Sequence, residues 1–256
     1  MTASLKQCLQ ANQLTIGSWV TLAHPAIAEI MARAGFDWLT IDLEHSVITI
    51  REAEELIRVI SLHQVPPLVR LTSNDANQIK RVMDAGAHGV IVPMVNSRVE
   101  AERAVQAVHY PPFGRRGVGL ARAQGYGAAF ADYRTWLEKE AVVIVQIEHI
   151  DAVNDLEAIL TVPGVIGYII GPYDLSASMG IPGEFDDPRV IAAIEKVRTT
   201  GIALGISGGL HVVEPDSSKL KDAIGKGFRF LAYSLDTRIL DVHSRQGLAE
   251  CRQLAP

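Results

Sequence analysis

The chain has 256 residues, 48% hydrophobic and 21% charged, which is enough to bury a large core. Its net charge is -5 and its Lys and Arg residues are scattered, so we expect a small-molecule partner, with no nucleic acid and no membrane. The N-terminal segment "MTASLKQCLQANQL" has no apolar h-region, which argues against secretion, and no apolar run approaches ~20 residues, which argues against membrane spanning. Cys8 and Cys251 lie in predicted terminal helices without CxxC spacing, so the sequence predicts neither structural zinc nor a disulfide framework and favours a cytoplasmic protein.

Short β-branched runs alternate with helical patterns along nearly the whole chain. The strands are predicted at 16–20, 38–43, 67–71, 89–93, 142–147, 165–170, 203–206 and 228–233. They are continuously apolar, as expected when both faces of a parallel sheet are covered. Eight βα units in a chain of this length favour a single-domain (β/α)8 TIM barrel over an open doubly wound sheet. The one long irregular stretch, 110–127, is typical of a functional or mobile loop.

Polar residues gather where the predicted strands end. Asp42, Glu44 and His45 follow the second strand, and Arg70 ends the third. Gln146 and Glu148 end the fifth, and the sixth runs into Asp174. Any one of them could be a helix cap or a surface ion pair. Because barrel enzymes build their active sites at the carboxyl ends of the strands, the set together favours a catalytic site.

Glu148 and Asp174 are the predicted metal ligands. Two carboxylates without Cys or an HExxH motif favour a hard or borderline divalent ion that keeps several waters. The alternatives are a salt bridge between Glu148 and Arg70, and an N-cap role for Asp174.

His45 is the predicted proton carrier, because imidazole has an unperturbed pKa near ~6.5, and Asp42 could orient it. The alternative is a surface histidine beside a helix that Ser46 or Thr49 caps. Arg70 is predicted to bind a substrate carboxylate or enolate.

Neutral groups complete the predicted site. Gln146 and the backbone of 171–174, including Gly171 and Pro172, could hydrogen-bond the same anion. Trp19, closing the first strand, is either an apolar wall of the site or a core residue. All seven lysines fall away from the carboxyl ends of the predicted strands, so a Schiff-base mechanism has no nucleophile.

Six segments in this order carry a resemblance to a known family: "DLEHS", "PLVRL", "MDAGAHGVIVPMV", "YPPFGRRGVG", "VQIEH" and "GPYDLS". The chain resembles the HpcH/HpaI aldolases, metal-dependent pyruvate-class enzymes such as 4-hydroxy-2-oxo-heptanedioate aldolase and 2-dehydro-3-deoxyglucarate aldolase. The resemblance implies that Glu148 and Asp174 bind Mg²⁺, Mn²⁺ or Co²⁺ and that Arg70 stabilises pyruvate enolate. It also implies that His45, paired with Asp42, moves protons.

The resemblance further implies that Gln146 and the 171–172 backbone touch pyruvate. It implies that Asp84 reaches a neighbouring subunit's site and that the protein is a homo-oligomer built from dimers, often a hexamer. A C-terminal helix, about 236–250, would be exchanged between subunits.

Two segments depart from the family pattern. "AYSLD" places Tyr233 and Leu235 where smaller residues are common, and "SGGLHVVEPDSSK" is longer and adds His211. Both departures concern the aldehyde half of a substrate.

These observations predict reversible cleavage of a 4-hydroxy-2-oxo acid into pyruvate and an aldehyde through an enolate that a divalent ion stabilises. The nearest alternative is an acyl-CoA lyase of malyl- or citramalyl-CoA type, for which Arg115 and Arg116 are the clustered basic residues, although a solvated loop explains them too. A phosphate-binding barrel using "GISGGL" and a non-catalytic metabolite-binding barrel are two further alternatives.

Overall fold

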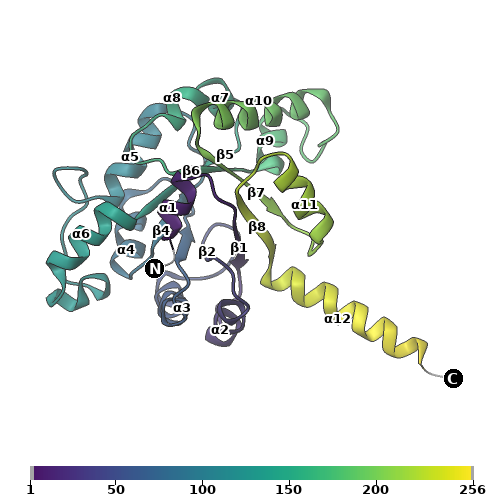
Figure 1. Ribbon diagram of the computed structural model, residues 1–256, viewed down its shortest axis with the longest axis horizontal. Helices are drawn as coiled ribbons and strands as arrows, with labels where there is room; N and C mark the ends of the chain where they lie inside the picture. The colour runs from purple at the N-terminus through teal and green to yellow at the C-terminus, as the bar shows by residue number, and fades with distance from the viewer. Residues whose placement is uncertain (1–2, 255–256) are drawn as a thin grey trace.

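The computed structural model describes residues 3–254 and shows a closed barrel of parallel strands in chain order, β1 to β8, with β1 pairing with β8. Helices surround the strands (Figure 1). The predicted (β/α)8 barrel is therefore confirmed. The strands are β1 Thr15–Val20, β2 Trp38–Asp42, β3 Pro67–Arg70, β4 Gly89–Val92, β5 Val142–Ile147, β6 Gly167–Ile170, β7 Ser207–Val212 and β8 Phe230–Leu235.

The helices begin at polar caps that the sequence supplies. Thr49 caps α3 in a reciprocal capping box with Glu52, and Asp75 and Ser97 accept backbone N–H bonds at the starts of α4 and α5. The helices are α1 Leu5–Gln10, α2 Pro25–Arg33, α3 Ile50–Leu62, α4 Ala76–Asp84, α5 Arg98–Val108, the 3-10 helix η1 Arg122–Gly127, α6 Phe130–Glu140, α7 Ile150–Asn154, α8 Leu156–Leu160, α9 Pro172–Ser178, α10 Pro188–Leu204, α11 Ser217–Gly225 and α12 Asp236–Gln253.

The barrel has two apolar cores, one inside the strands and one between the strands and the helices. Inside, the Trp38 ring stacks on Phe230 with centroids 4.1 Å apart. A Cβ on Gly17 would lie 2.1 Å from the Trp38 ring, so only glycine fits there. Leu5 and Leu9 of α1 join this inner core, which closes the amino end of the barrel. The closed end leaves the carboxyl ends of the strands as the open face.

The seventh strand lies later than predicted. We expected it at 203–206, but α10 continues to Leu204 and ends at Gly205, which adopts the left-handed conformation with φ 69°. The apolar run "IALGI" fits a buried helix end as well as a strand, and periodicity alone cannot separate the two. The strand is Ser207–Val212, so "GISGGL" is largely β-strand and not a phosphate loop. The same correction moves His211 from a loop to a strand end.

The long loop after α5 is not simply solvated. The Arg116 side chain is fully buried and donates to the Val108 carbonyl and to the hydroxyls of Tyr110 and Tyr133. Its guanidinium also lies 4.3 Å from the centroid of the Tyr110 ring. Arg116 therefore holds the loop against the barrel, and the solvated-loop interpretation is wrong for this residue.

Helix α12 extends away from the barrel (Figure 1). Its first residue, Asp236, is buried and accepts hydrogen bonds from the backbone of Thr21 and Leu22, which ties the helix start to the loop after β1. Farther along, Leu240 and Leu248 are exposed. The exchange of this helix between subunits stays a prediction. Within 3–254, no helix is both long and apolar enough to cross a membrane.

Candidate active site

A cavity of about 470 Å³ opens at the carboxyl ends of the strands. Eight of the ten site residues predicted from the sequence line it, and Glu148 lies behind its wall, in contact with the lining residue Gln146. The tenth, Asp84, does not line it. The residues that line it are Trp19, Thr21, Asp42, His45, Arg70, Gln146, Ile169, Ile170, Gly171, Pro172, Tyr173, Asp174, His211, Val213 and Leu235.

Asp42 and Arg70 form the central ion pair of the site. They are register partners on β2 and β3, and Arg70 donates from Nε to Oδ1 at 2.9 Å and from Nη2 to Oδ2 at 2.7 Å. The Asp42 carboxylate also accepts the backbone N–H groups of Glu44 and His45. We expected Asp42 to orient the His45 imidazole, but within residues 3–254 its carboxylate bonds the His45 backbone and the Arg70 side chain and makes no hydrogen bond to that ring. Asp42 instead fixes one edge of the guanidinium, because bidentate pairing is the preferred geometry of arginine with a carboxylate.

Glu44 belongs to the same cluster, although no role was predicted for it. Its Oε2 lies 3.3 Å from Arg70 Nη1 in a salt bridge. Burial raises the pKa of Glu44 to about 7, Arg70 lowers it, and the carboxylates of Asp42 and Asp174 raise it. Its position in "DLEHS" beside two predicted site residues was the signal that could have identified it.

Glu148 is buried, and its carboxylate is held on both oxygens. Oε1 accepts the Met94 backbone N–H at 2.8 Å, and Oε2 accepts a hydrogen bond from the Gln146 side chain. Burial raises the pKa of Glu148 to about 7, these two hydrogen bonds oppose the rise, and the charges of Glu44 and Asp174 add to it. The alternative salt bridge between Glu148 and Arg70 is not what the structure shows, since Arg70 pairs with Asp42 and Glu44.

Gly171 makes room for the Glu148 carboxylate. A Cβ at this position would lie 2.6 Å from Glu148 Oε2, so any side chain here would displace the acid. The Gly171 amide donates to the Ile147 carbonyl, and Pro172 has no amide hydrogen, so neither supplies the backbone donor that we expected. Tyr173 and Asp174 follow in the first turn of α9, where backbone N–H groups lack intrahelical partners.

Asp174 is not the N-cap of α9. Gly171 occupies that position, and Asp174 lies within the first turn and lines the cavity. The negative charge of Asp174 adds to the raised pKa values of both Glu44 and Glu148.

His45 stands at the cavity mouth with 63% of its side chain exposed and its Nε2 3.9 Å from Glu44 Oε2. Helix α3 is capped by Thr49, so His45 has no capping function. His149, next to Glu148, caps α7 and does not line the cavity.

Trp19 is both a core residue and a wall of the site, the two roles that the sequence left open. It is buried with the inner core and also lines the cavity. The Arg70 guanidinium lies 4.4 Å from its ring centroid, a cation–π contact. The His211 ring lies 5.5 Å from the Trp19 ring, centroid to centroid. His211, which the sequence marked as a departure from the family pattern without a specific role, therefore lines the site.

Asp84 lies at the end of α4, where its Oδ1 is 3.5 Å from Arg116 Nη2. Its contact with a neighbouring subunit's site stays a prediction.

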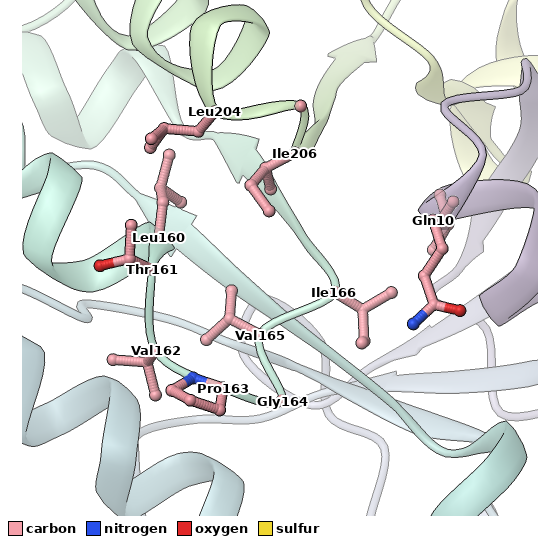
Figure 2. Close-up of a pocket in the computed structure, with 12 residues that line it drawn as sticks. Gln10, Leu160, Thr161, Val162, Pro163, Gly164, Val165, Ile166, Leu204 and Ile206 are labelled. Atoms are coloured by element: carbon pink, nitrogen blue, oxygen red, sulfur yellow. The ribbon is translucent and has the colours of Figure 1, made fainter.

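A second cavity, of about 480 Å³, lies at the opposite end of the barrel (Figure 2). The residues that line it include Val165 and Ile166, just before β6, and Ile206, just before β7. No titratable side chain lines this second cavity. It therefore offers no acid, base or metal ligand.

The residues of the first cavity fit a divalent cation. Glu44 Oε2 is buried and accepts no hydrogen bond, although it lies 3.3 Å from Arg70 Nη1. The charges of Glu44 and Asp174 act on Glu148, and Gly171 leaves space beside the Glu148 carboxylate. Hard cations such as Mg²⁺ prefer carboxylate oxygens and retain waters. Across residues 3–254, no group of three or more His, Cys, Asp or Glu side chains is arranged to hold a metal, and the predicted metal site has two protein ligands, Glu148 and Asp174.

A closed barrel with acids, an arginine and a histidine at its carboxyl rim is an enzyme architecture. The model of the HpcH/HpaI aldolase/citrate lyase family matches residues 15–241. The chain belongs to this family, and it is a carbon–carbon lyase.

Named relatives cover most of the chain. It is 40% identical to a hydroxypyruvate/pyruvate aldolase of Sagittula stellata, over 92% of each chain. It is 39% identical to a 4-hydroxy-2-oxo-heptane-1,7-dioate aldolase of Salmonella dublin, over 94% of this chain and 91% of the relative.

Solved structures share the fold. A Burkholderia cenocepacia family protein superposes with a TM-score of 0.92 at 33% identity, covering 98% of this chain and 100% of that one. The citrate lyase β subunit of M. tuberculosis, solved with oxaloacetate and magnesium, has a TM-score of 0.60 at 16% identity, covering 91% of this chain and 96% of that one.

Proposed function

We propose that this protein cleaves a 4-hydroxy-2-oxo acid reversibly into pyruvate and an aldehyde, with a divalent ion at Glu148 and Asp174. One observation carries the proposal: Arg70, Gln146 and Asp174 line one cavity, and Glu148 lies directly behind it. The aldolase names of the relatives supply the reaction class.

Arg70 is the group that binds the negative charge on the 2-oxo acid. Asp42 engages its Nε and one Nη2 hydrogen, and Nη1 lies 3.3 Å from Glu44 Oε2, which leaves the second Nη2 hydrogen and one Nη1 hydrogen for substrate oxygens. Because Asp42 and the Trp19 ring fix the guanidinium, these donors are oriented before the substrate arrives. Charge that develops as the C3–C4 bond breaks is then stabilised without reorganisation.

Proton transfer is assigned to His45. Its exposed imidazole at the cavity mouth can exchange protons with solvent, and Glu44 is the nearest acid. In the cleavage direction a base removes the proton of the 4-hydroxyl group, and an acid returns a proton to the methylene carbon of the enolate.

The divalent ion supplies electron withdrawal from the substrate's carbonyl oxygen when it is bound. Mg²⁺, Mn²⁺ and Co²⁺ all suit the proposed ligands. The magnesium in the M. tuberculosis citrate lyase β subunit supports a metal on this fold.

The acyl-CoA alternative requires a basic groove to which Arg116 would contribute. Arg116 is buried and bonded to protein groups, so it cannot bind the phosphates of CoA. Arg115 alone remains exposed.

Exchange of pyruvate's methyl protons with D2O tests the proposal before any aldehyde is known. We expect exchange with Mg²⁺, Mn²⁺ or Co²⁺, loss of exchange after exhaustive chelation, and strong impairment in Arg70→Ala. Pyruvate release from a 4-hydroxy-2-oxo acid that survives chelation, or an unimpaired Arg70→Ala enzyme, would refute it. Release from CoA esters alone would instead identify the acyl-CoA lyase.

A homo-oligomer, dimer-based and in the family pattern a hexamer, belongs to the same proposal, as does a cytoplasmic location. The exposed leucines of α12 support a helix that packs against another subunit.

A further inference from the structure

His211 stands at the carboxyl end of β7 and lines the active-site cavity. Its ring lies 5.5 Å from the Trp19 ring, which the Arg70 guanidinium also contacts. The reaction steps proposed above give this residue no task. Its surroundings nevertheless fix its orientation and its protonation.

The unusual ends of β7 and β8 form one structural feature. Ser234 adopts a left-handed conformation with φ 52°, next to the point where the register between β1 and β8 shifts. Its carbonyl oxygen lies 3.0 Å from His211 Nε2, and its hydroxyl donates to the Val213 carbonyl at 2.8 Å. The Ser18 hydroxyl donates to the same Ser234 carbonyl. The bent end of β8 therefore holds the ring of His211.

This contact decides which nitrogen carries the proton. A carbonyl oxygen only accepts hydrogen bonds, so Nε2 of His211 must be the donor. Burial and, to a smaller extent, the charge of Arg70 lower the pKa of His211 to about 4 against the opposing effects of the Ser234 carbonyl and Asp42, so the ring is neutral near pH 7. Nδ1 is then a bare acceptor, and within residues 3–254 no hydrogen bond to it is formed.

The cavity has two chemically different walls. Asp42, Arg70, Gln146 and Asp174 form a charged and polar wall on β2, β3, β5 and the start of α9. Trp19, Val213 and Leu235 form an apolar wall on β1, β8 and the segment after β7, and His211 is set among them. The oxo-acid half of a substrate belongs against the charged wall, which leaves the aldehyde half against the apolar wall.

We propose that His211 determines aldehyde specificity: its Nδ1 accepts a hydrogen bond from a hydroxyl group on the aldehyde half of the substrate. The enzyme then favours short hydroxyaldehydes over alkyl aldehydes of equal size. This inference rests on the proposed aldolase function and names its substrate class. Leu235 and Val213 contact the carbon chain, and His211 recognises the hydroxyl.

The test compares glycolaldehyde with propanal, which replaces the hydroxyl by a methyl group, as acceptors for pyruvate. The readout is the ratio of kcat/KM for the two aldehydes in the wild type, His211→Leu and His211→Asn. We expect His211→Leu to lower the ratio about tenfold, the effect of losing one hydrogen bond of about 1.4 kcal/mol. His211→Asn keeps an acceptor near the Nδ1 position and is expected to restore most of the ratio. Pyruvate methyl exchange, measured for each variant, normalises for the amount of working enzyme.

An unchanged ratio in both variants overturns the inference. So does a His211 effect that appears only when hydroxypyruvate replaces pyruvate as the donor, because the recognised hydroxyl would then belong to the donor half. Failure of the wild type to exchange pyruvate protons with any divalent ion overturns the aldolase function itself, which distinguishes the two failures.

Discussion

The two ends of this barrel hold cavities of nearly equal volume and opposite chemistry. The carboxyl-end cavity is lined by Asp42, Arg70 and Asp174, and burial raises the pKa of the adjoining Glu44 and Glu148 to about 7. The amino-end cavity is lined by aliphatic side chains and small polar ones (Figure 2). Burying an unpaired charge costs stability, and groups with strongly shifted pKa values cluster at functional sites. The volume of a cavity therefore does not identify the active site, whereas the buried carboxylates beside it do.

The largest expected effect follows from removing one charge at the carboxyl end. Glu148→Gln is expected to lower kcat/KM about 10³-fold, because the proposed ion loses a ligand worth several kcal/mol of transition-state stabilisation. Its melting temperature without metal should not fall, since a neutral amide relieves the repulsion with Glu44 and Asp174. Steady-state kinetics and thermal melts with and without Mn²⁺ check both statements. Glu55→Gln, the same exchange on the exposed face of α3, is the matched control.

Disrupting the Asp42–Arg70 pair is expected to cost about 10²-fold in kcat, the usual loss when an oriented donor to a developing anion is misplaced. A double-mutant cycle sharpens the assignment of Asp42. If Asp42 positions Arg70, the losses in Asp42→Asn and Arg70→Lys are non-additive, while those in Asp42→Asn and His45→Ala add. If the loss in Asp42→Asn is non-additive only with that in His45→Ala, then Asp42 acts on His45, as the sequence led us to expect.

A cavity change at the amino end should alter stability and leave catalysis intact. Ile166→Ala removes a buried side chain and is expected to lower the free energy of unfolding by about 2–4 kcal/mol. Urea denaturation measures this loss, and kcat/KM should match the wild type. A large fall in kcat/KM in the folded variant would show that the two ends of the barrel are coupled.

The two ends should also respond oppositely to pH in the metal-free protein. Native Glu148 keeps its proton to about pH 7, while unfolded Glu releases it near ~4.5, so stability falls as pH rises across this range. Burial lowers the pKa of His88, just before β4, to about 4, so its contribution is lost as pH falls from ~6.5 to ~4.

Each pH dependence should disappear when its residue is replaced. Glu148→Gln is expected to remove the loss of stability toward neutral pH, and His88→Gln the loss toward acidic pH. Each change is on the order of 2 kcal/mol in the free energy of unfolding, measured by urea denaturation from pH 4 to 7.5. If the slopes are unchanged in both variants, other groups govern the pH dependence.

The sequence by itself determined the barrel and most of its rim. Continuous apolar runs at βα spacing require a covered parallel sheet, and a polar residue directly after such a run must lie at the carboxyl end. These are local patterns, which is why Arg70, Gln146 and Asp174 were found without a structure. The seventh strand was misplaced because the run "IALGI" satisfies a helix end and a strand equally well.

Only the tertiary structure decided which of these groups touch. Asp42 is three residues from His45 but pairs with Arg70 across the sheet, and Gly171 is a glycine because Glu148, on the neighbouring strand, needs its space. The burial of Arg116 and the contact of His211 with Ser234 likewise depend on segments that fold together. Register and packing between distant segments determine which side chains are partners in a closed sheet. The periodicity of a single segment therefore cannot predict these contacts.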